Sequence, residues 1–353
     1  MYKELPRSDI AELICTLGNQ VNFLVEGHIG SSKSALLEDI SQALPDHHPV
    51  YFDMATIADA GDFQIPAVNH ETQTSSFYPN ASLGVHTDTP MIIMFDELGK
   101  SASQSIINAI LPAFNDRRWG NRKFHPDTVV FGTTNLGREH VGDVLKPHVS
   151  NRLTRLRMAK PTADEYIAYM AGRGLDPILG AWIKRNPHCF QSFEELENPE
   201  DNPLVYHPDS RHSAFVTHRS MTRANDIMCM RDKLGEDAVV HALMGTVGAP
   251  AALDIQTFIR MADQLPSPTE IQDDPTGVVV PSDASAMIYL GCQAAKWVTR
   301  DTLSAWMTFM QRFEFAEAKA VFALMMANDI EKYKWASRNK TFTDFLRSHQ
   351  HLF

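Results

Sequence analysis

Short apolar runs alternate with amphipathic stretches along the first 160 residues. Five runs have the length and composition of buried strands: Val21–Glu26, Pro49–Asp53, Pro90–Asp96, Asp127–Thr134 and Leu153–Met158. Between them, apolar residues recur at helical spacing, first at Ala35, Leu36, Ile40 and Leu44 and later at Ile106, Ile107, Ile110, Leu111 and Phe114. This alternation predicts an α/β fold, in which right-handed crossover helices cover a parallel sheet.

The strand pattern disappears after Lys160. Helical spacing then predicts helices at Thr162–Ala171, Asp176–Arg185, Thr222–Leu234 and Glu236–Met244. The segment Gln264–Pro281 contains four prolines and little apolar periodicity, which indicates a connector. Helical spacing returns from Ala284 to Phe345, with Trp297, Trp306 and Phe309 as expected anchors. We therefore expect an α/β domain over 1–160, a helical domain over 161–265, and a connector with a helical C-terminal extension over 266–353.

Composition and charge exclude several classes of protein. Hydrophobic residues make up 44% of the 353 residues and charged residues 21%, so the chain can bury a sizeable core. The net charge of -11 disfavours general attraction to nucleic acid or anionic membranes, and only a local basic patch would bind nucleic acid. No segment approaches the roughly 18 apolar residues of a membrane span. The scattered cysteines, without a CxxC pair, fit reduced thiols, and we expect a cytoplasmic protein.

A small-residue loop follows the first long strand and precedes a helix. The sequence GHIGSSKS, from Gly27 to Ser34, has the spacing of a phosphate-binding loop, in which backbone N–H groups and the helix N-terminus surround an anion. Lys33 would reach the outer phosphates, and the Ser34 hydroxyl would hold Mg²⁺. Ser32 replaces the glycine that normally precedes the lysine, and we expect it to take a helix-start conformation with negative φ. Alone, the motif would also fit a turn before an ordinary helix.

Two acids end the third apolar strand. In MIIMFDEL, Asp96 and Glu97 stand where open α/β sheets place their ligands. Asp96 would orient Mg²⁺ through its water, and Glu97 would take the proton from the water that attacks the γ-phosphate. A solvated turn would also carry two acids, but it would not explain their distance from a phosphate loop. The next strand, TVVFGTTN, ends in Asn135, whose amide would orient the attacking water.

These motifs together resemble AAA+ ATPases, and within them the MoxR-like branch. The stretches that carry the resemblance are VEGHIGSSKSALL, DELGKSASQSIINAILPAFNDRRWG, VVFGTTN, LKPHVSNRL and HRSMTRAND. The resemblance implies a P-loop α/β core, an all-α lid and ATP hydrolysis with Mg²⁺. It assigns the nucleotide to Gly27, His28, Ile29, Gly30, Ser31, Ser32, Lys33, Ser34, Ala35 and Asp96, with Ser34 and Asp96 also serving Mg²⁺.

The resemblance also implies catalytic residues and an assembly. Glu97 and Asn135 correspond to the catalytic acid and the sensor 1 residue. Arg152, in SNRL, stands for the arginine finger that acts on the ATP of a neighbouring subunit, and Arg219 or Arg223 stands for the sensor 2 arginine of the lid. A finger given to a neighbour implies a ring, usually of six subunits. Ser32, Ile29 in place of a frequent proline, and SNRL in place of DRF depart from the pattern.

Two insertions are candidates for binding partners. The stretch Ala67–Thr89 is polar and is interrupted by an FYP sequence, and NDRRWGNRKFHPD at 115–127 predicts a hairpin with Trp119 beside its turn. Both also fit ordinary surface loops with an aromatic residue packed against the domain. His207, His212 and His218, with Asp209, lie close in sequence, but their spacing fits a polar loop better than a metal site.

Three functions are compatible with these features. The leading interpretation is an ATP-driven ring that remodels a protein client, and by analogy with the family the client is a protein with a von Willebrand factor A domain. The second is a nucleic-acid motor, which the net charge disfavours and the basic residues Arg117, Arg118, Arg122 and Lys123 favour. The third is a scaffold that binds ATP without hydrolysing it, which the replacement of glycine by Ser32 would allow.

Overall fold

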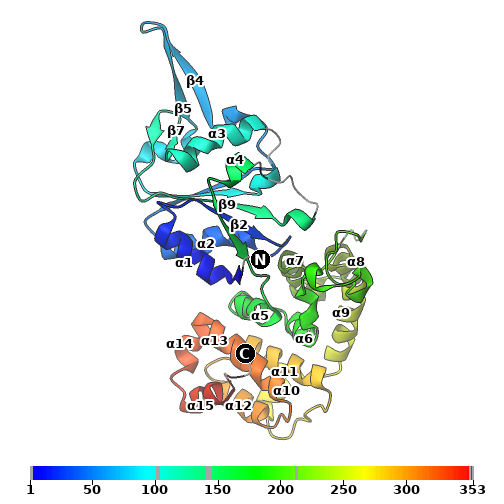
Figure 1. Ribbon diagram of the computed structural model, residues 1–353. Coiled ribbons are helices and arrows are strands. Elements are labelled where there is room, and N and C mark those ends of the chain that lie inside the picture. The colour runs from blue at the N-terminus through cyan, green and yellow to red at the C-terminus, as the bar shows by residue number, and fades with distance from the viewer. Residues whose placement is uncertain are drawn as a thin grey trace. The chain divides into compact units, whose positions relative to one another are not determined.

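The chain folds into two compact units, which meet in sequence at Lys160 and Pro161. The computed structural model describes residues 3–100, 104–139, 145, 147–210, 214–349 and 351. Figure 1 shows an α/β unit followed by an all-helical unit. The predicted fold class, a parallel sheet with flanking helices followed by helices only, is therefore confirmed.

The first unit is built on a six-stranded sheet in which every pairing is parallel. Its strand order is β1-β10-β2-β9-β6-β3, with β1 at Glu4–Leu5, β2 at Phe23–Gly27, β3 at His48–Asp53, β6 at Met91–Asp96, β9 at Val129–Asn135 and β10 at Thr154–Met158. The five strands that the apolar runs predict are all present. The short edge strand β1 was missed, because two residues give no periodicity.

Helices cover both faces of this sheet (Figure 1). Helices α1 (Arg7–Leu17) and α2 (Leu36–Ala43) share one apolar core with the strand residues Phe23, Val25, Ile92, Met94, Val129 and Phe131. Helix α3 (Gln104–Asn115) belongs to the opposite core, with Leu24, Ile93, Phe95 and Val130. Alternate residues of the central strands thus face opposite cores, and this explains why their sequences are almost wholly apolar.

Two antiparallel hairpins interrupt the α/β pattern. Strands β4 (Gln64–Asn69) and β5 (Thr74–Pro79) form an arm that projects from the unit, and β7 (Arg118–Trp119) and β8 (Arg122–Lys123) form a shorter one. Trp119 is only 2% exposed and stacks against Phe52 and Phe95. The structure agrees with the alternative in which the aromatic residue of this hairpin packs against the domain, since the surrounding rings bury Trp119 in the core.

The second unit consists of helices around one continuous apolar core. After α4 (Pro147–Ser150), which still belongs to the first unit, the helices are α5 (Ala163–Ala171), α6 (Pro177–Arg185), α7 (His218–Cys229), α8 (Glu236–Val247), α9 (Ala249–Ala262), α10 (Pro268–Asp273), α11 (Ala284–Trp297), α12 (Leu303–Gln311), α13 (Ala316–Asn328), α14 (Ile330–Ala336) and α15 (Lys340–His349). Residues on both sides of the proline-rich segment contribute to this core, so the helices before and after it pack as one body.

Three details of the second unit differ from the sequence-based expectation. The proline-rich connector contains α10, whose start is capped by Ser267 with Pro268 at its first turn. Helix α7 begins at His218 and not at Thr222, because Thr217 forms its capping box. Trp297 is 52% exposed because it is the last residue of α11, whereas the other two expected anchors are fully buried.

In the described part of the chain, no helix has the length and apolarity needed to cross a bilayer.

Candidate functional site

The phosphate loop leaves β2 at Gly27 and ends in a short 3-10 turn, Lys33–Ala35, that leads into α2. Gly30 and Ser32 have φ of 66° and 65°, whereas Ser31 between them is not left-handed. This alternation of hand turns successive N–H groups toward one side and creates an anion-binding concavity. The expectation of negative φ at Ser32 is therefore wrong, since the concavity itself requires a left-handed residue there.

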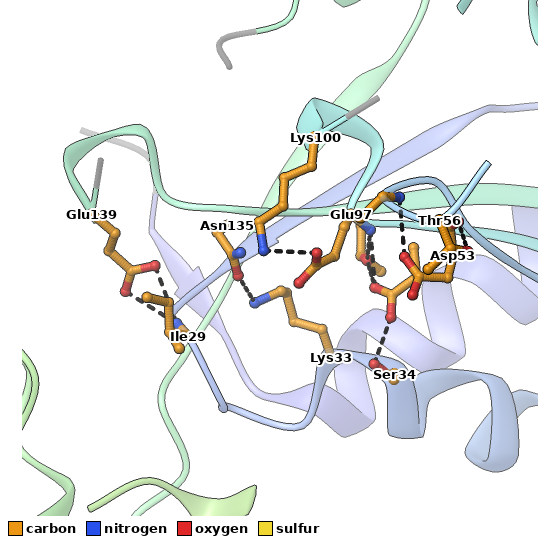
Figure 2. A network of polar contacts seen from close by, with 12 residues as sticks. Ile29, Lys33, Ser34, Asp53, Thr56, Glu97, Lys100, Asn135 and Glu139 are labelled. Atoms are coloured by element: carbon orange, nitrogen blue, oxygen red, sulfur yellow. Dashed lines mark hydrogen bonds and ion pairs between the residues drawn. The ribbon is translucent and has the colours of Figure 1, made fainter. Parts of the chain in front are cut away.

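Lys33 is buried, and its amine lies inside the curve of the loop. Its Nζ donates hydrogen bonds to the carbonyl oxygens of Gly27 at 3.0 Å and His28 at 2.8 Å, and to Asn135 Oδ1 at 2.8 Å. Figure 2 shows the amine pointing toward Asn135. All three acceptors are neutral, so a phosphate oxygen would bind the ammonium group more strongly than any of them.

Asp96 connects the phosphate loop to the neighbouring strands. Its Oδ2 accepts hydrogen bonds from Ser34 Oγ at 2.7 Å and from the Tyr51 hydroxyl at 2.9 Å, and its Oδ1 accepts from the Thr133 hydroxyl. The side chain of Asp96 is almost completely buried. Burial and the negative charge of Asp96 raise the pKa of Tyr51, so the phenol remains a donor.

The oxygen atoms around Asp96 are suited to Mg²⁺. This ion prefers hard oxygen ligands and retains several waters, and it commonly binds through one or two protein oxygens plus substrate phosphates. The Ser34 hydroxyl and the Asp96 carboxylate supply such oxygens next to the phosphate loop, and Asp53 is the register partner of Asp96 on β3. The donor set therefore fits the expected metal.

Glu97 follows β6 with a left-handed backbone, φ 54°. Its N–H donates to Asp96 Oδ1 at 3.2 Å and Thr133 Oγ1 at 3.3 Å, which holds the residue at the strand end. Its carboxylate pairs with Lys100 Nζ at 2.7 Å (Figure 2). Both side chains are about a quarter exposed, so solvent screens this ion pair and it contributes little to stability.

Asn135 lies between the loop and the acids because of the strand order. Strand β9 is inserted between β2 and β6, and its last residue, Asn135, is the register partner of Gly27. The Asn135 side chain thus faces Lys33, and Glu97, which directly follows β6, lies nearby (Figure 2). Five residues predicted from separate motifs, Lys33, Ser34, Asp96, Glu97 and Asn135, meet at one edge of the sheet.

Arg152 does not join this cluster within its own chain. It follows the short helix α4 and precedes β10, whose first residue, Thr154, is the register partner of Phe23 at the start of β2. Arg152 therefore lies at the amino edge of the sheet, whereas the phosphate loop lies at the carboxyl edge. On β10 itself, Arg155 pairs with Glu26 and Arg157 pairs with Glu4, as expected for residues with structural roles.

The two candidate lid arginines belong to the second unit. Arg219 and Arg223 are one turn apart on α7, and both are exposed. Their position four residues apart places them on the same face of that helix. Their roles toward the nucleotide remain predictions.

His207 and His218, the two described members of the histidine group, make contacts within the fold. His207 accepts a hydrogen bond from the Asp209 N–H, and His218 stacks on Phe190 with a ring centroid distance of 4.1 Å. His212 lies outside the described residues. Within the described part of the chain, neither His207 nor Asp209 belongs to a group placed to hold a metal ion.

Three residues of the site escaped the sequence analysis: Tyr51, Lys100 and Glu139. The Glu139 carboxylate accepts hydrogen bonds from the Ile29 N–H and lies within 3.1 Å of His28 Nδ1. Tyr51 carries no sequence signal, because it is one aromatic residue within an apolar strand. Lys100 follows Glu97 by three residues, and Glu139 follows Asn135 by four. This closeness to a motif is the only sequence signal for them.

Comparison with known proteins gives a likeness in solved structures alone. No family model and no curated protein matches the chain. Matching structures include a Cytophaga hutchinsonii protein provisionally described as an ATPase, at 11% identity and TM-score 0.33, covering 72% of this chain and 88% of that one. The Thermotoga maritima RuvB Holliday junction branch migration motor has 12% identity and TM-score 0.36, covering 87% and 86%. A point variant of that RuvB has 15% identity and TM-score 0.41, covering 87% and 88%. Because these scores are low, the matches carry no conclusion about function.

The left-handed conformation of Ser32 has a measurable consequence. Replacing Ser32 with glycine relieves about 1–2 kcal/mol of backbone strain, and about half of this is offset by the greater freedom of glycine in the unfolded chain. We expect Ser32→Gly to raise the free energy of unfolding by about 0.5–1 kcal/mol in chemical denaturation, and to change ATP turnover by less than about tenfold.

Ser31→Gly is the matched control. Ser31 is not left-handed, and its hydroxyl donates a 2.7 Å hydrogen bond to the His28 carbonyl. This variant should therefore be less stable than the parent. Equal effects of the two variants on stability would contradict the assignment of strain to Ser32, and ATP turnover seen only in Ser32→Gly would favour the scaffold interpretation.

Proposed function

We propose that the protein is a Mg²⁺-dependent ATPase of the AAA+ class, MoxR-like in type, that works as a ring on a protein client. The observation that carries the ATPase part is the meeting of Lys33, Ser34, Asp96, Glu97 and Asn135 at the carboxyl edge of one sheet. A loop that only turned into a helix would need neither the buried acid nor the amide next to the lysine.

Each of these residues has a defined part in hydrolysis. The N–H groups of the phosphate loop and Lys33 bind the phosphates and neutralise the charge that develops on the γ-phosphate. Asn135 orients the attacking water, and Glu97 takes one proton from that water as its oxygen bonds to phosphorus. The bond from the γ-phosphorus to the bridging oxygen breaks, which yields ADP and phosphate. Ser34 and, through a water, Asp96 would hold Mg²⁺, which would supply positive charge next to the outer phosphates.

Subunit sharing is proposed from the position of Arg152. An arginine finger must reach a γ-phosphate, and this residue lies at the opposite edge of the sheet from its own phosphate loop. A ring, expected to have six subunits by the family resemblance, would offer it to the ATP of the neighbour. Arg219, or failing it Arg223, would act on the nucleotide of its own chain.

The β4–β5 arm is the proposed contact for a protein client. Its exposed apolar side chains are Ile65, Val68, Phe77 and Tyr78, with exposed fractions between 44% and 65%. Ile65 and Tyr78 are register partners and so share one face of the arm. Clustered exposed apolar groups of this kind are typical of protein contacts. A client with a von Willebrand factor A domain remains part of the proposal by family analogy.

The nucleic-acid alternative is weaker than the sequence indicates. Of its four basic residues, Arg117 donates to the Thr128 carbonyl, and Arg118 pairs with Asp116 and donates to the Gly120 carbonyl. Only Arg122 and Lys123 of β8 remain as exposed basic residues without a structural contact of this kind. Two cations neutralise too few phosphates to offset a net charge of -11.

The nucleotide assignment is tested at Lys33 and Glu97. Lys33→Ala removes the charge that faces the phosphates and should weaken binding of a fluorescent ATP analogue by about 100-fold or more. Glu97→Gln should keep the analogue bound and lower phosphate release by about 100-fold or more, because the proton acceptor is lost. Unchanged affinity in Lys33→Ala would remove the nucleotide site, and parental turnover in Glu97→Gln would remove the general base.

A trans role for Arg152 predicts complementation between inactive proteins. Arg152→Ala and Lys33→Ala should each lose about 10³-fold in turnover. Mixed rings contain some interfaces with both residues intact, so part of the ATPase should return on mixing. Lys33→Ala mixed with Glu97→Gln is the matched control and should stay inactive, since both changes affect the same side of each site. Failure of the first mixture to recover, in rings shown to exchange subunits, would place Arg152 elsewhere.

The proposed client contact predicts loss of coupling without loss of ATPase. A permanently unfolded, carboxymethylated protein should stimulate phosphate release by the parent. The double variant Ile65→Ser, Tyr78→Ser should lose most of this stimulation and keep basal turnover. Val279→Ser, which alters an even more exposed residue (79%) of the other unit, should keep both. Retained stimulation in the double variant, or stimulation by DNA at about 0.15 M salt, would contradict the assignment.

A further inference from the structure

Glu139 is a buried carboxylate that the proposed hydrolysis does not use. It is 1% exposed and ends the short 3-10 turn Gly137–Glu139, four residues after Asn135. Buried carboxylates are costly unless they are paired and hydrogen-bonded. The contacts that Glu139 makes must therefore offset the cost of burying its charge.

Glu139 contacts the phosphate loop. The Ile29 N–H donates to both of its carboxylate oxygens, at 3.0 and 3.1 Å (Figure 2). In addition, His28 Nδ1 is 3.1 Å from Glu139 Oε1. Glu139 and Ile29 are 110 residues apart in sequence. Charge-assisted hydrogen bonds of this kind are about twice as strong as neutral ones.

Glu139 and Asn135 hold the loop at two points. Asn135 accepts from Lys33 near the end of the loop, and Glu139 accepts from Ile29 near its beginning. A chain segment of five residues, 135–139, thus spans the loop. A negative charge beside a phosphate site opposes anion binding, so the benefit of Glu139 must come from the geometry that it imposes.

We propose that Glu139 is a positioning residue that fixes the first turn of the phosphate loop and thereby sets the affinity for ATP. The inference rests on the proposed ATPase function. A loop held in its binding conformation loses less conformational freedom when ATP binds. The chemical step depends on Glu97 and Asn135, so the affinity changes when Glu139 is replaced, and the rate at saturating ATP does not.

Two replacements separate the hydrogen bonds from the charge. Glu139→Ala removes both, and we expect the fluorescent ATP analogue to bind about tenfold more weakly. Glu139→Gln removes the charge but keeps a carbonyl acceptor for the Ile29 N–H, and its affinity should equal or exceed that of the parent. The turnover number at saturating ATP should stay within about threefold in both variants.

A second-site replacement tests the specific bond. Proline has no N–H, so Ile29→Pro removes the donor that Glu139 satisfies and also fixes φ. Ile29 is not among the residues with positive φ, so the sign of its φ is compatible with proline. Adding Ile29→Pro to Glu139→Ala should restore the affinity to within about threefold of the parent. A residue with a merely supporting role in the fold would not be rescued in this way.

The outcomes distinguish this inference from the proposed function. A parent protein that does not bind the analogue would reject the ATPase itself. A parent that binds, with Glu139→Ala binding as tightly or more tightly, would reject the positioning role alone, as would equal losses in the alanine and glutamine variants or a fall in turnover at unchanged affinity. Thermal unfolding checks that each variant is folded, and if the proline variant is not, the comparison of alanine with glutamine decides.

Discussion

The hydrogen bond from Ser34 to Asp96 is the contact on which the site depends. It joins the start of α2 to the end of β6, two segments that are 62 residues apart. Because all strands of the sheet are parallel, their carboxyl ends share one edge, and crossover helices start from that edge. The strand order then inserts β9 between β2 and β6, and so brings an amide between the lysine and the second acid.

The site keeps its geometry at a cost that other residues offset. Ser32 and Glu97 are both held in the left-handed region, where residues other than glycine are strained. The backbone N–H of Glu97 donates to Asp96 and Thr133. In the phosphate loop, the backbone N–H of Ile29 donates to Glu139. Strained residues persist where the surrounding contacts determine them, and here those contacts come from two neighbouring strands, β6 and β9, and from the turn after β9.

Sequence alone predicted the elements whose signal is local. The five long strands and the loop, acid and amide motifs were found because each lies within fewer than ten consecutive residues and has its own chemistry. Tyr51 and Glu139 were missed because their roles arise from neighbours that are 45 and 110 residues away. The error at Ser32 has a different cause, since serine alone favours negative φ and the concavity of the loop imposes the opposite sign. For Trp119 the sequence left both a partner contact and packing against the domain open, because a hairpin turn alone does not show that the aromatic rings beside it form a core.

The proposed function requires this sheet edge to hydrolyse ATP with Mg²⁺. Phosphate release by the purified full chain can be followed in the same size-exclusion fractions with Mg²⁺ and with a chelator. Release should require Mg²⁺ and should appear in fractions whose light scattering corresponds to an assembled ring. Absence of release in every fraction, or equal release in the presence of the chelator, would contradict the proposed function.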